Sequence, residues 1–198
     1  MKMSIILIDH YDSFTANLRD WLSCEFHVQT YQYDRMPSAS CLPCSPIVLS
    51  PGRKDPQSAP QTCDLVFEKH QQVPLLGVCL GHQILGHCFG SQIQCSRNPV
   101  HGEVKNFEQQ GKDPLFEGFG KEFSGAAYHS LVVENVPQGW EQLATCEYGE
   151  VQAMRSPGVL GAFSYGIQFH PESFMTLDGE RILQNWKKIV LQWKAAQA

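Results

Sequence analysis

A cysteine between two glycines is the residue of this sequence best placed for chemistry. Cys79 lies in the run Gly77-Val78-Cys79-Leu80-Gly81, at the end of the short apolar stretch Pro74–Val78. This order predicts a buried strand, a tight turn and a helix, which is the nucleophile-elbow pattern with sulfur in place of oxygen. Glycines leave room beside the turn, and the start of the following helix favours the thiolate, which is the nucleophilic form of cysteine. We therefore expect Cys79 to be a nucleophile rather than a structural thiol.

A histidine near the C-terminus can supply the base that such a nucleophile needs. His170 follows the apolar run Ile167-Gln168-Phe169, and Glu172 comes two residues later. Side chains two apart on extended backbone point the same way, and the intervening proline keeps His170 out of the helical region. A carboxylate at Glu172 could then hold the imidazole tautomer that accepts the thiol proton. By spacing alone, a histidine and a glutamate two residues apart are more often an exposed surface pair. The cysteine elbow strengthens the case that this pair is catalytic.

The composition is that of an ordinary globular protein. The chain has 198 residues, 42% of them hydrophobic and 18% charged, with a formal net charge of −5. It lacks a Lys/Arg run, so we expect no nucleic-acid partner. The apolar stretch Met3–Ile8 is too short for a signal peptide or a membrane span, so we expect a cytoplasmic protein without membrane attachment. With no linker or repeat, residues 1–198 are expected to form one domain.

The eight cysteines do not suggest a metal site. Cys41-Leu42-Pro43-Cys44 is a C-x-x-C pair, but no second pair completes a four-ligand zinc site. The pair also lies in a stretch rich in proline and serine, so we expect a structural or incidental role for Cys41 and Cys44. No cluster of histidine, cysteine and carboxylate has ligand spacing, and we expect neither metal nor cofactor.

The first half of the chain alternates strands with helices. This alternation predicts a parallel sheet with helices on both faces, in which function gathers at the C-terminal ends of the strands. Polar loops that begin at Asp9 and Ser50, together with Cys79, lie at such ends. Ser13 is the expected N-cap of the first helix. The expected strands are residues 4–8, 26–33, 47–49 and 74–78, and a second helix is expected over 62–70.

The second half is predominantly strand-like. A final helix is indicated by apolar residues at helical spacing from Ile182 to Trp193. Together the two halves predict an α/β fold with a mostly parallel sheet, helices on both faces and extra antiparallel strands in the second half. The expected strands of that half are residues 92–95, 102–107, 122–127, 131–134, 142–145, 151–155 and 166–169.

Three separated motifs resemble the signatures of class I glutamine amidotransferases, whose flavodoxin-like fold is therefore expected. They are residues 77–83, Tyr128-His129-Ser130-Leu131 and residues 168–173. Two further segments, residues 8–15 and 100–102, narrow the resemblance to the glutaminase component of anthranilate synthase and aminodeoxychorismate synthase. The likeness runs from about Ser4 to Trp186, nearly the whole chain.

The resemblance implies a glutaminase that uses a catalytic triad. Cys79 would attack the side-chain amide carbon of L-glutamine, release ammonia and leave a thioester. Water would then hydrolyse the thioester, with His170 as the base and Glu172 as the group that orients it. The matching positions of the family would also assign an oxyanion hole and a substrate site. The oxyanion would be held by the N–H groups of Gly52 and Leu80, and the amino-acid end of the substrate by Gly52, Gln83, Ser130 and Leu131.

One loop departs from the family pattern. The family usually has Ser-Pro-Gly-Pro-Gly-x-Pro, whereas here Arg53 and Lys54 replace the second proline and glycine. Gly52 is retained, so the oxyanion donor is still expected. The substrate contacts expected from the next two positions stay open.

The other histidines are expected to have no part in catalysis. His10 stands where the family often has asparagine and is interpreted as a tolerated change. His82 follows the nucleophile closely but is expected to point away from it. We interpret His101 and His129 as structural or interface residues.

A glutaminase that supplies ammonia needs a recipient. Free ammonia in neutral water is mostly protonated and non-nucleophilic, so a docked, chorismate-binding synthase subunit is expected, in a hetero-oligomer. Three alternatives stay open: a glutaminase for another amidotransferase, a catalytically weakened binding or regulatory subunit, and a cysteine hydrolase acting on another amide. The sequence does not decide whether the aminated product is anthranilate or 4-amino-4-deoxychorismate.

Overall fold

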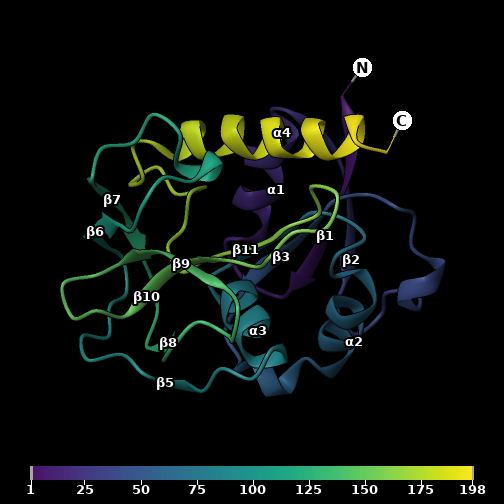
Figure 1. Ribbon diagram of the computed structural model, residues 1–198. Coiled ribbons are helices and arrows are strands. Elements are labelled where there is room, and N and C mark those ends of the chain that lie inside the picture. Colours follow the sequence, from purple (N-terminus) through teal and green to yellow (C-terminus); the bar gives the residue numbers. More distant parts are fainter. Residues whose placement is uncertain (1, 198) are drawn as a thin grey trace.

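The computed structural model describes residues 2–197, and its central feature is a nine-stranded sheet with helices on both faces (Figure 1). The helices are α1 (Thr15–Ser23), α2 (Pro60–Lys69), α3 (Leu80–Cys88) and α4 (Gly179–Ala195), and short 3-10 turns span Ala39–Cys41, Pro56–Ser58 and Pro114–Phe116. The strands are β1 (Met3–His10), β2 (Phe26–Gln32), β3 (Ile47–Gly52), β4 (Leu75–Val78), β5 (Ile93–Cys95), β6 (Glu103–Gln109), β7 (Glu122–Ala127), β8 (Leu131–Val133), β9 (Glu141–Thr145), β10 (Val151–Arg155) and β11 (Ser164–Ile167).

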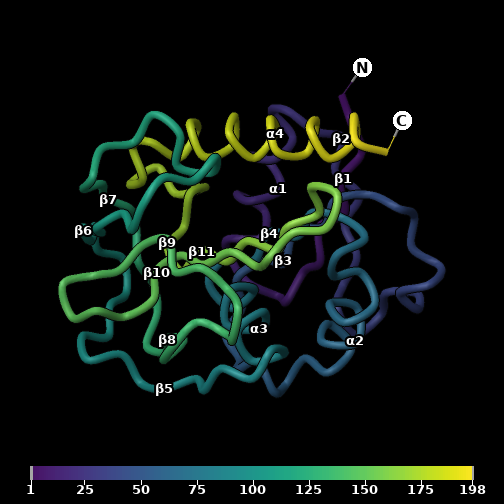
Figure 2. Tube along the Cα trace, viewed as in Figure 1, coloured from purple at the N-terminus to yellow at the C-terminus, as the bar shows by residue number. Residues whose placement is uncertain are grey.

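The sheet has a parallel part and an antiparallel part. Its order is β2-β1-β3-β4-β11-β10-β9-β6-β7, with parallel pairing from β2 to β11 and antiparallel pairing from there on. This agrees with the fold expected from the sequence. The chain reverses its direction across the sheet between β1 and β3, and such reversal points are where α/β sheets open a crevice at their C-terminal ends. A separate pair, β5 and β8, lies beside α3 (Figure 2).

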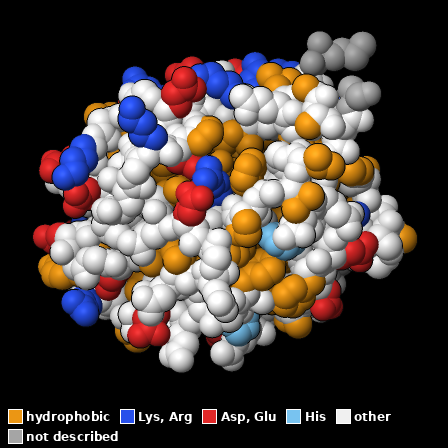
Figure 3. Space-filling view, viewed as in Figure 1, with side chains coloured by type: hydrophobic (Ala, Val, Ile, Leu, Met, Phe, Trp, Pro, Cys, Tyr) orange, Lys and Arg blue, Asp and Glu red, His pale blue; other side chains and the backbone are white. Residues whose placement is uncertain are grey.

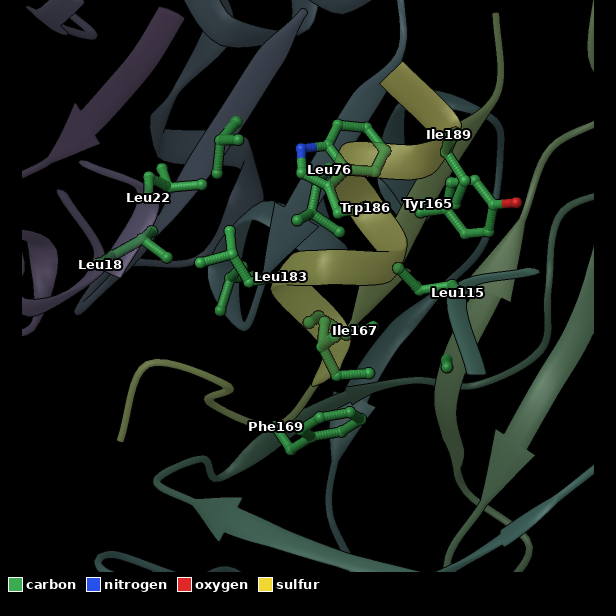
Figure 4. Close-up of a cluster of buried hydrophobic side chains, with 14 of the residues drawn as sticks. Leu18, Leu22, Leu76, Leu115, Tyr165, Ile167, Phe169, Leu183, Trp186 and Ile189 are labelled. Atoms are coloured by element: carbon green, nitrogen blue, oxygen red, sulfur yellow. The ribbon is translucent and has the colours of Figure 1, made fainter. Parts of the chain in front are cut away.

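Strand β1 is apolar because both of its faces are covered. Ile5 and Leu7 belong to the core under α1 and α4, whereas Ile6 and Ile8 belong to the core over α2 and α3. Successive side chains of a strand point to opposite faces, so a strand buried on both sides is a continuous apolar run. Figure 4 shows the first core, in which Leu18 and Leu22 of α1 lie across from side chains of α4. The α4 side chains labelled there are Leu183, Trp186 and Ile189.

Several boundaries differ from those predicted. Strands β1 and β3 extend to His10 and Gly52, so residues expected in loops belong to the sheet. The prediction that Ser13 caps α1 is wrong, because the helix begins at Thr15 and its N-cap position makes no side-chain cap. Asp12 instead closes a turn just before the helix, since its Oδ1 accepts the N–H of Phe14 at 2.8 Å.

The surface charges are mixed on the visible face, and the helices are those of a globular fold. On the face shown in Figure 3, Lys and Arg side chains are interspersed with Asp and Glu rather than gathered in one basic patch. Among residues 2–197, the helices are too short or too polar to cross a bilayer.

Candidate active site

The turn between β4 and α3 holds Cys79 in a strained backbone conformation. Its φ is 52° and its ψ is −103°, in a region that residues with a side chain seldom adopt. A Cβ atom on Gly77 would lie 2.4 Å from the backbone of Gly81, and one on Gly81 would lie 2.4 Å from the carbonyl oxygen of Leu49. Both glycines are therefore required by close backbone packing, as the sequence predicted. Backbone strain of this kind is commonly found at functional sites, where surrounding structure maintains it.

The Cys79 thiol lies at the N-terminus of α3 with polar neighbours. Its side chain is 6% exposed. Its N–H donates to the carbonyl oxygen of Ile167 at 2.9 Å, which joins the elbow to β11. Gln168 Nε2 donates to Cys79 Sγ at 3.7 Å. The N–H groups and positive dipole end of α3 favour a negative charge on this sulfur.

His170 and Glu172 form a buried pair beside Cys79. His170 Nδ1 lies 2.7 Å from Glu172 Oε1, so the Nε2 nitrogen remains for the thiol. Burial would lower the pKa of His170, but the neighbouring Cys79 and Glu172 outweigh it and raise the pKa to about 10. The imidazole therefore readily holds a proton taken from Cys79.

Packing fixes the position of the His170 ring. The ring lies 5.4 Å from the ring of Phe14 and 5.0 Å from that of Tyr128, measured between centroids. The backbone is held as well: the His170 N–H donates to Ala126 at 2.9 Å, and Thr176 Oγ1 donates to the His170 carbonyl at 2.6 Å. A base held from several sides needs little reorganisation before reaction.

A cavity of about 420 Å³ opens over these groups. All of the expected site residues except Leu80 and Glu172 line it. Leu80 is the first residue of α3, where its N–H has no partner within the helix. Glu172 lies behind His170. The structure thus brings the expected site residues together. The lining comprises Asp12, Ser13, Phe14, Pro51, Gly52, Arg53, Lys54, Cys79, Gln83, His101, Tyr128, His129, Ser130, Leu131 and His170.

Gln83 connects the nucleophile helix to the opposite wall. Its Nε2 donates to the carbonyl oxygen of Leu131 at 2.8 Å and to Gln168 Oε1 at 3.2 Å. Gln168 therefore bridges Gln83 and the Cys79 sulfur, a role that the sequence analysis missed. The available signal was its spacing, because Gln168 stands two residues before His170 and can share its face.

Arg53 and Lys54 lie at the mouth of the cavity. Both residues are exposed, and within residues 2–197 neither has a carboxylate within salt-bridge distance. They therefore place two positive charges on this side of the cavity, available to a charged partner.

Three further histidines, His82, His101 and His129, lie near the site in different surroundings. His82 is fully buried against Gly166, and burial lowers its pKa to about 3, so it is neutral. It does not line the cavity, which agrees with the expectation that it points away. His129 does line the cavity, with its pKa lowered to about 4 by burial. His101 Nε2 lies 3.0 Å from Ser130 Oγ at the rim.

The cysteines outside the site do not assemble into a metal centre. Cys41 and Cys44 are exposed and not joined in a disulfide. In the part of the chain that the structure describes, histidines, cysteines and carboxylates form no cluster suited to a metal ion.

Comparison with known proteins gives one consistent result for the sequence. The profile of the family described as glutamine amidotransferase class-I matches residues 6–189. "Anthranilate synthase component 2, pyocyanine specific" from Pseudomonas aeruginosa is 36% identical over 206 residues, covering 99% of this chain and 96% of that protein. "Anthranilate synthase component 2" from Archaeoglobus fulgidus is 34% identical over 182 residues, covering 92% of this chain and 96% of that protein.

Solved structures share the fold. A Thermoplasma acidophilum protein, assigned as one of the subunits of GMP synthase, has a TM-score of 0.88 at 21% identity, covering 100% of this chain and 98% of that one. A glutamine amidotransferase from Thermotoga maritima has a TM-score of 0.68 at 16% identity, covering 99% of this chain and 90% of that one. At these identities the likeness concerns the fold alone, and it confirms the fold class expected from the sequence.

Proposed function

This chain belongs to the class I glutamine amidotransferase family, and we propose that it is the glutaminase subunit of a chorismate-aminating synthase. The family predicted from the sequence motifs is thereby confirmed. The observation that carries the proposal is the joint placement of Cys79, His170 and Gln83 on one cavity, with Glu172 held against His170.

The first half of the proposed reaction forms a thioester. His170 Nε2 accepts the proton of the Cys79 thiol, and the sulfur attacks the side-chain amide carbon of L-glutamine. The oxygen of that amide becomes an oxyanion, and we assign its stabilisation to the N–H groups of Leu80 and Gly52. His170 returns the proton to the amide nitrogen, the carbon–nitrogen bond breaks, and ammonia leaves.

The second half regenerates the enzyme. A water molecule loses a proton to His170 and attacks the thioester carbon. The carbon–sulfur bond breaks, glutamate leaves, and Cys79 regains its proton. Glu172 keeps Nδ1 protonated throughout, so Nε2 alternates between base and acid. Each turnover thus consumes one glutamine and one water and releases one glutamate and one ammonia.

A synthase subunit is the proposed recipient of the ammonia. Relatives named anthranilate synthase component 2 support a two-component enzyme, and they favour anthranilate over 4-amino-4-deoxychorismate as the product. The segment after Glu172 carries two large apolar side chains that the folded chain leaves in solvent: Phe174 is 90% exposed and Leu177 is 87% exposed. Exposed apolar side chains so close to the cavity suit a protein–protein interface. We place the partner there, in a cytoplasmic hetero-oligomer built from a single-domain glutaminase.

Co-expression with candidate synthase chains tests the proposal. We expect the complex to convert chorismate and glutamine into anthranilate, which is detected by its fluorescence. Phe174→Ser/Leu177→Ser should weaken the complex, whereas Phe67→Ser, an exposed apolar residue on α2, should not. Formation of 4-amino-4-deoxychorismate instead would correct the product. A complex that uses free ammonium but not glutamine would contradict the glutaminase role.

A further inference from the structure

His10 has more contacts than a tolerated substitution requires. It is 5% exposed, it does not line the cavity, and both ring nitrogens have polar neighbours. Nδ1 lies 3.2 Å from Ser50 Oγ, and Nε2 lies 3.0 Å from Thr62 Oγ1. The ring also stacks on Tyr33, with 5.4 Å between centroids. His10 thus connects three elements: β1, β3 and α2.

The protons in this cluster can be assigned by counting donors. The Ser50 hydroxyl donates its hydrogen to the carbonyl oxygen of Pro51 at 2.7 Å, and it accepts the backbone N–H of His10 at 2.9 Å. It can therefore only accept from Nδ1, which must carry the ring proton. Burial lowers the pKa of His10 to about 4, so near neutral pH the ring is neutral and Nε2 has no proton. Nε2 then accepts the hydroxyl hydrogen of Thr62.

This cluster lies where the pairing of β1 with β3 is irregular. Ile8 pairs with Leu49 but His10 pairs with Gly52, so Ser50 and Pro51 stand opposite Asp9 alone. Such a bulge bends the strand and re-aims the residues beside it. Pro51 has no N–H to donate to the ladder at this point. The N–H of His10 finds its acceptor in the Ser50 hydroxyl.

Gly52 is in close contact with the same residue. A Cβ atom on Gly52 would lie 3.0 Å from His10 Cβ and 2.3 Å from a methyl carbon of Leu80. The backbone of Gly52 is thus packed between His10 and the first residue of α3. Because Leu80 and Gly52 carry the two proposed oxyanion donors, His10 is in a position to set the distance between them.

We propose that His10 is a positioning residue for the oxyanion hole: its neutral ring bridges Ser50 and Thr62 and thereby fixes the Gly52 N–H opposite that of Leu80. The inference rests on the proposed function, because it concerns the same reaction. It assigns to His10 an effect on the acyl-transfer step rather than on glutamine binding or on the Cys79 thiolate.

Two single substitutions break the same bond from opposite ends. Thr62→Val removes the hydroxyl that donates to Nε2 with little change in shape. His10→Asn retains a donor that can reach Ser50 but has no atom that reaches Thr62. Loss of one oxyanion donor costs about 10²–10³ in rate, so displacement of a donor should cost a part of that, roughly tenfold in kcat. The double variant should be no slower than either single variant, since the broken bond is shared.

The measurement uses the complex with the synthase. It records kcat and KM for glutamine hydrolysis and the rate at which iodoacetamide alkylates Cys79. We expect kcat to fall roughly tenfold, KM to stay within about twofold, and the rate of Cys79 alkylation by iodoacetamide to stay unchanged. Alkylation forms no oxyanion, so it reports the thiolate alone. Thr145→Val is the matched control, because Thr145 is also buried and accepts one side-chain hydrogen bond, from Gln110, but lies on β9.

Each departure from this pattern has a definite meaning. An unchanged kcat in both single variants overturns the proposal. Equal losses in kcat and alkylation overturn it as well, because the disturbance would then reach the nucleophile. Additive losses in the double variant exclude the bridge through Nε2. If the unmodified complex does not hydrolyse glutamine, the proposed function fails, and the role of His10 fails with it.

Discussion

The Cys79 elbow and the Gly52 loop (residues 50–54) border the same cavity but are held by different means. Backbone packing holds the elbow, since Gly77 and Gly81 leave no space for a side chain. The loop instead depends on side-chain hydrogen bonds around His10, and it continues into the exposed Arg53 and Lys54. Close packing leaves one arrangement, whereas the exposed end of the loop at Arg53 and Lys54 can be shifted by a docking partner. The nucleophile is therefore fixed in advance, and the adjustable part is the exposed end of the loop that directly follows Gly52.

The largest expected effect is the loss of the nucleophile in the elbow. Cys79→Ser should abolish glutamine hydrolysis, because the serine hydroxyl has a much higher pKa than the thiol and this site is built for a thiolate. Cys88→Ser changes a thiol at the other end of α3 and should retain activity. The measurement is glutamate release. Retained turnover in Cys79→Ser would contradict the assignment of the nucleophile.

A smaller effect is expected from changes to His170 and Glu172, the pair that acts on the Cys79 thiol. His170→Ala removes the base and should nearly eliminate thioester formation. Glu172→Gln keeps the shape of the side chain but removes its charge and can hold the wrong imidazole tautomer, so we expect a loss of about 10²- to 10⁴-fold in kcat. Thioester formation can be followed by mass spectrometry after acid quenching. Full activity in His170→Ala would transfer the role of base to another histidine, and His129, which lines the cavity, would be the first to test.

The pKa of His170 predicts how activity and stability vary with pH. Since it is raised to about 10 from an ordinary 6.5 in the free enzyme, the imidazolium persists to that pH, and kcat/KM should fall only as pH rises through about 10. The associated stabilisation of the fold is complete below pH 6.5 and is lost over the same rise. Glu172→Gln should move the alkaline limb of the kcat/KM profile to lower pH. An unmoved limb would show that the carboxylate does not raise the pKa.

The smallest effect is expected from the two cations of the Gly52 loop. Arg53→Ala/Lys54→Ala should weaken synthase binding by roughly two- to fivefold at low salt, the range of exposed ion pairs. At high salt the difference should disappear, because the charges are screened. Lys112→Ala, an exposed lysine away from the cavity, serves as the control. Equal affinities at low salt would exclude these cations from the interface.

Sequence patterns predicted the elbow better than the loop, for a physical reason. The apolar runs of β1 and β4 and the glycines around Cys79 are local signals of buried strands and a tight turn. The contacts of His10 join residues 40 and 52 positions apart, and no local pattern specifies them. The bridge from Gln168 to Cys79 likewise spans 89 positions. The prediction for Ser13 was wrong because α1 begins only at Thr15, after a turn that Asp12 closes by accepting the N–H of Phe14.

The central claim is that a glutaminase with a fixed nucleophile waits for a partner to complete its oxyanion hole. The most direct measurement is kcat for glutamine hydrolysis by the isolated chain, and then by the complex with its synthase and chorismate. Loss of one oxyanion donor costs about 10²–10³, so we predict that the isolated chain is slower by a substantial part of that factor. Iodoacetamide should alkylate Cys79 at the same rate in the isolated chain whether or not chorismate is present. If the isolated chain already hydrolyses glutamine at the rate of the complex, the oxyanion hole is preformed and the account is contradicted.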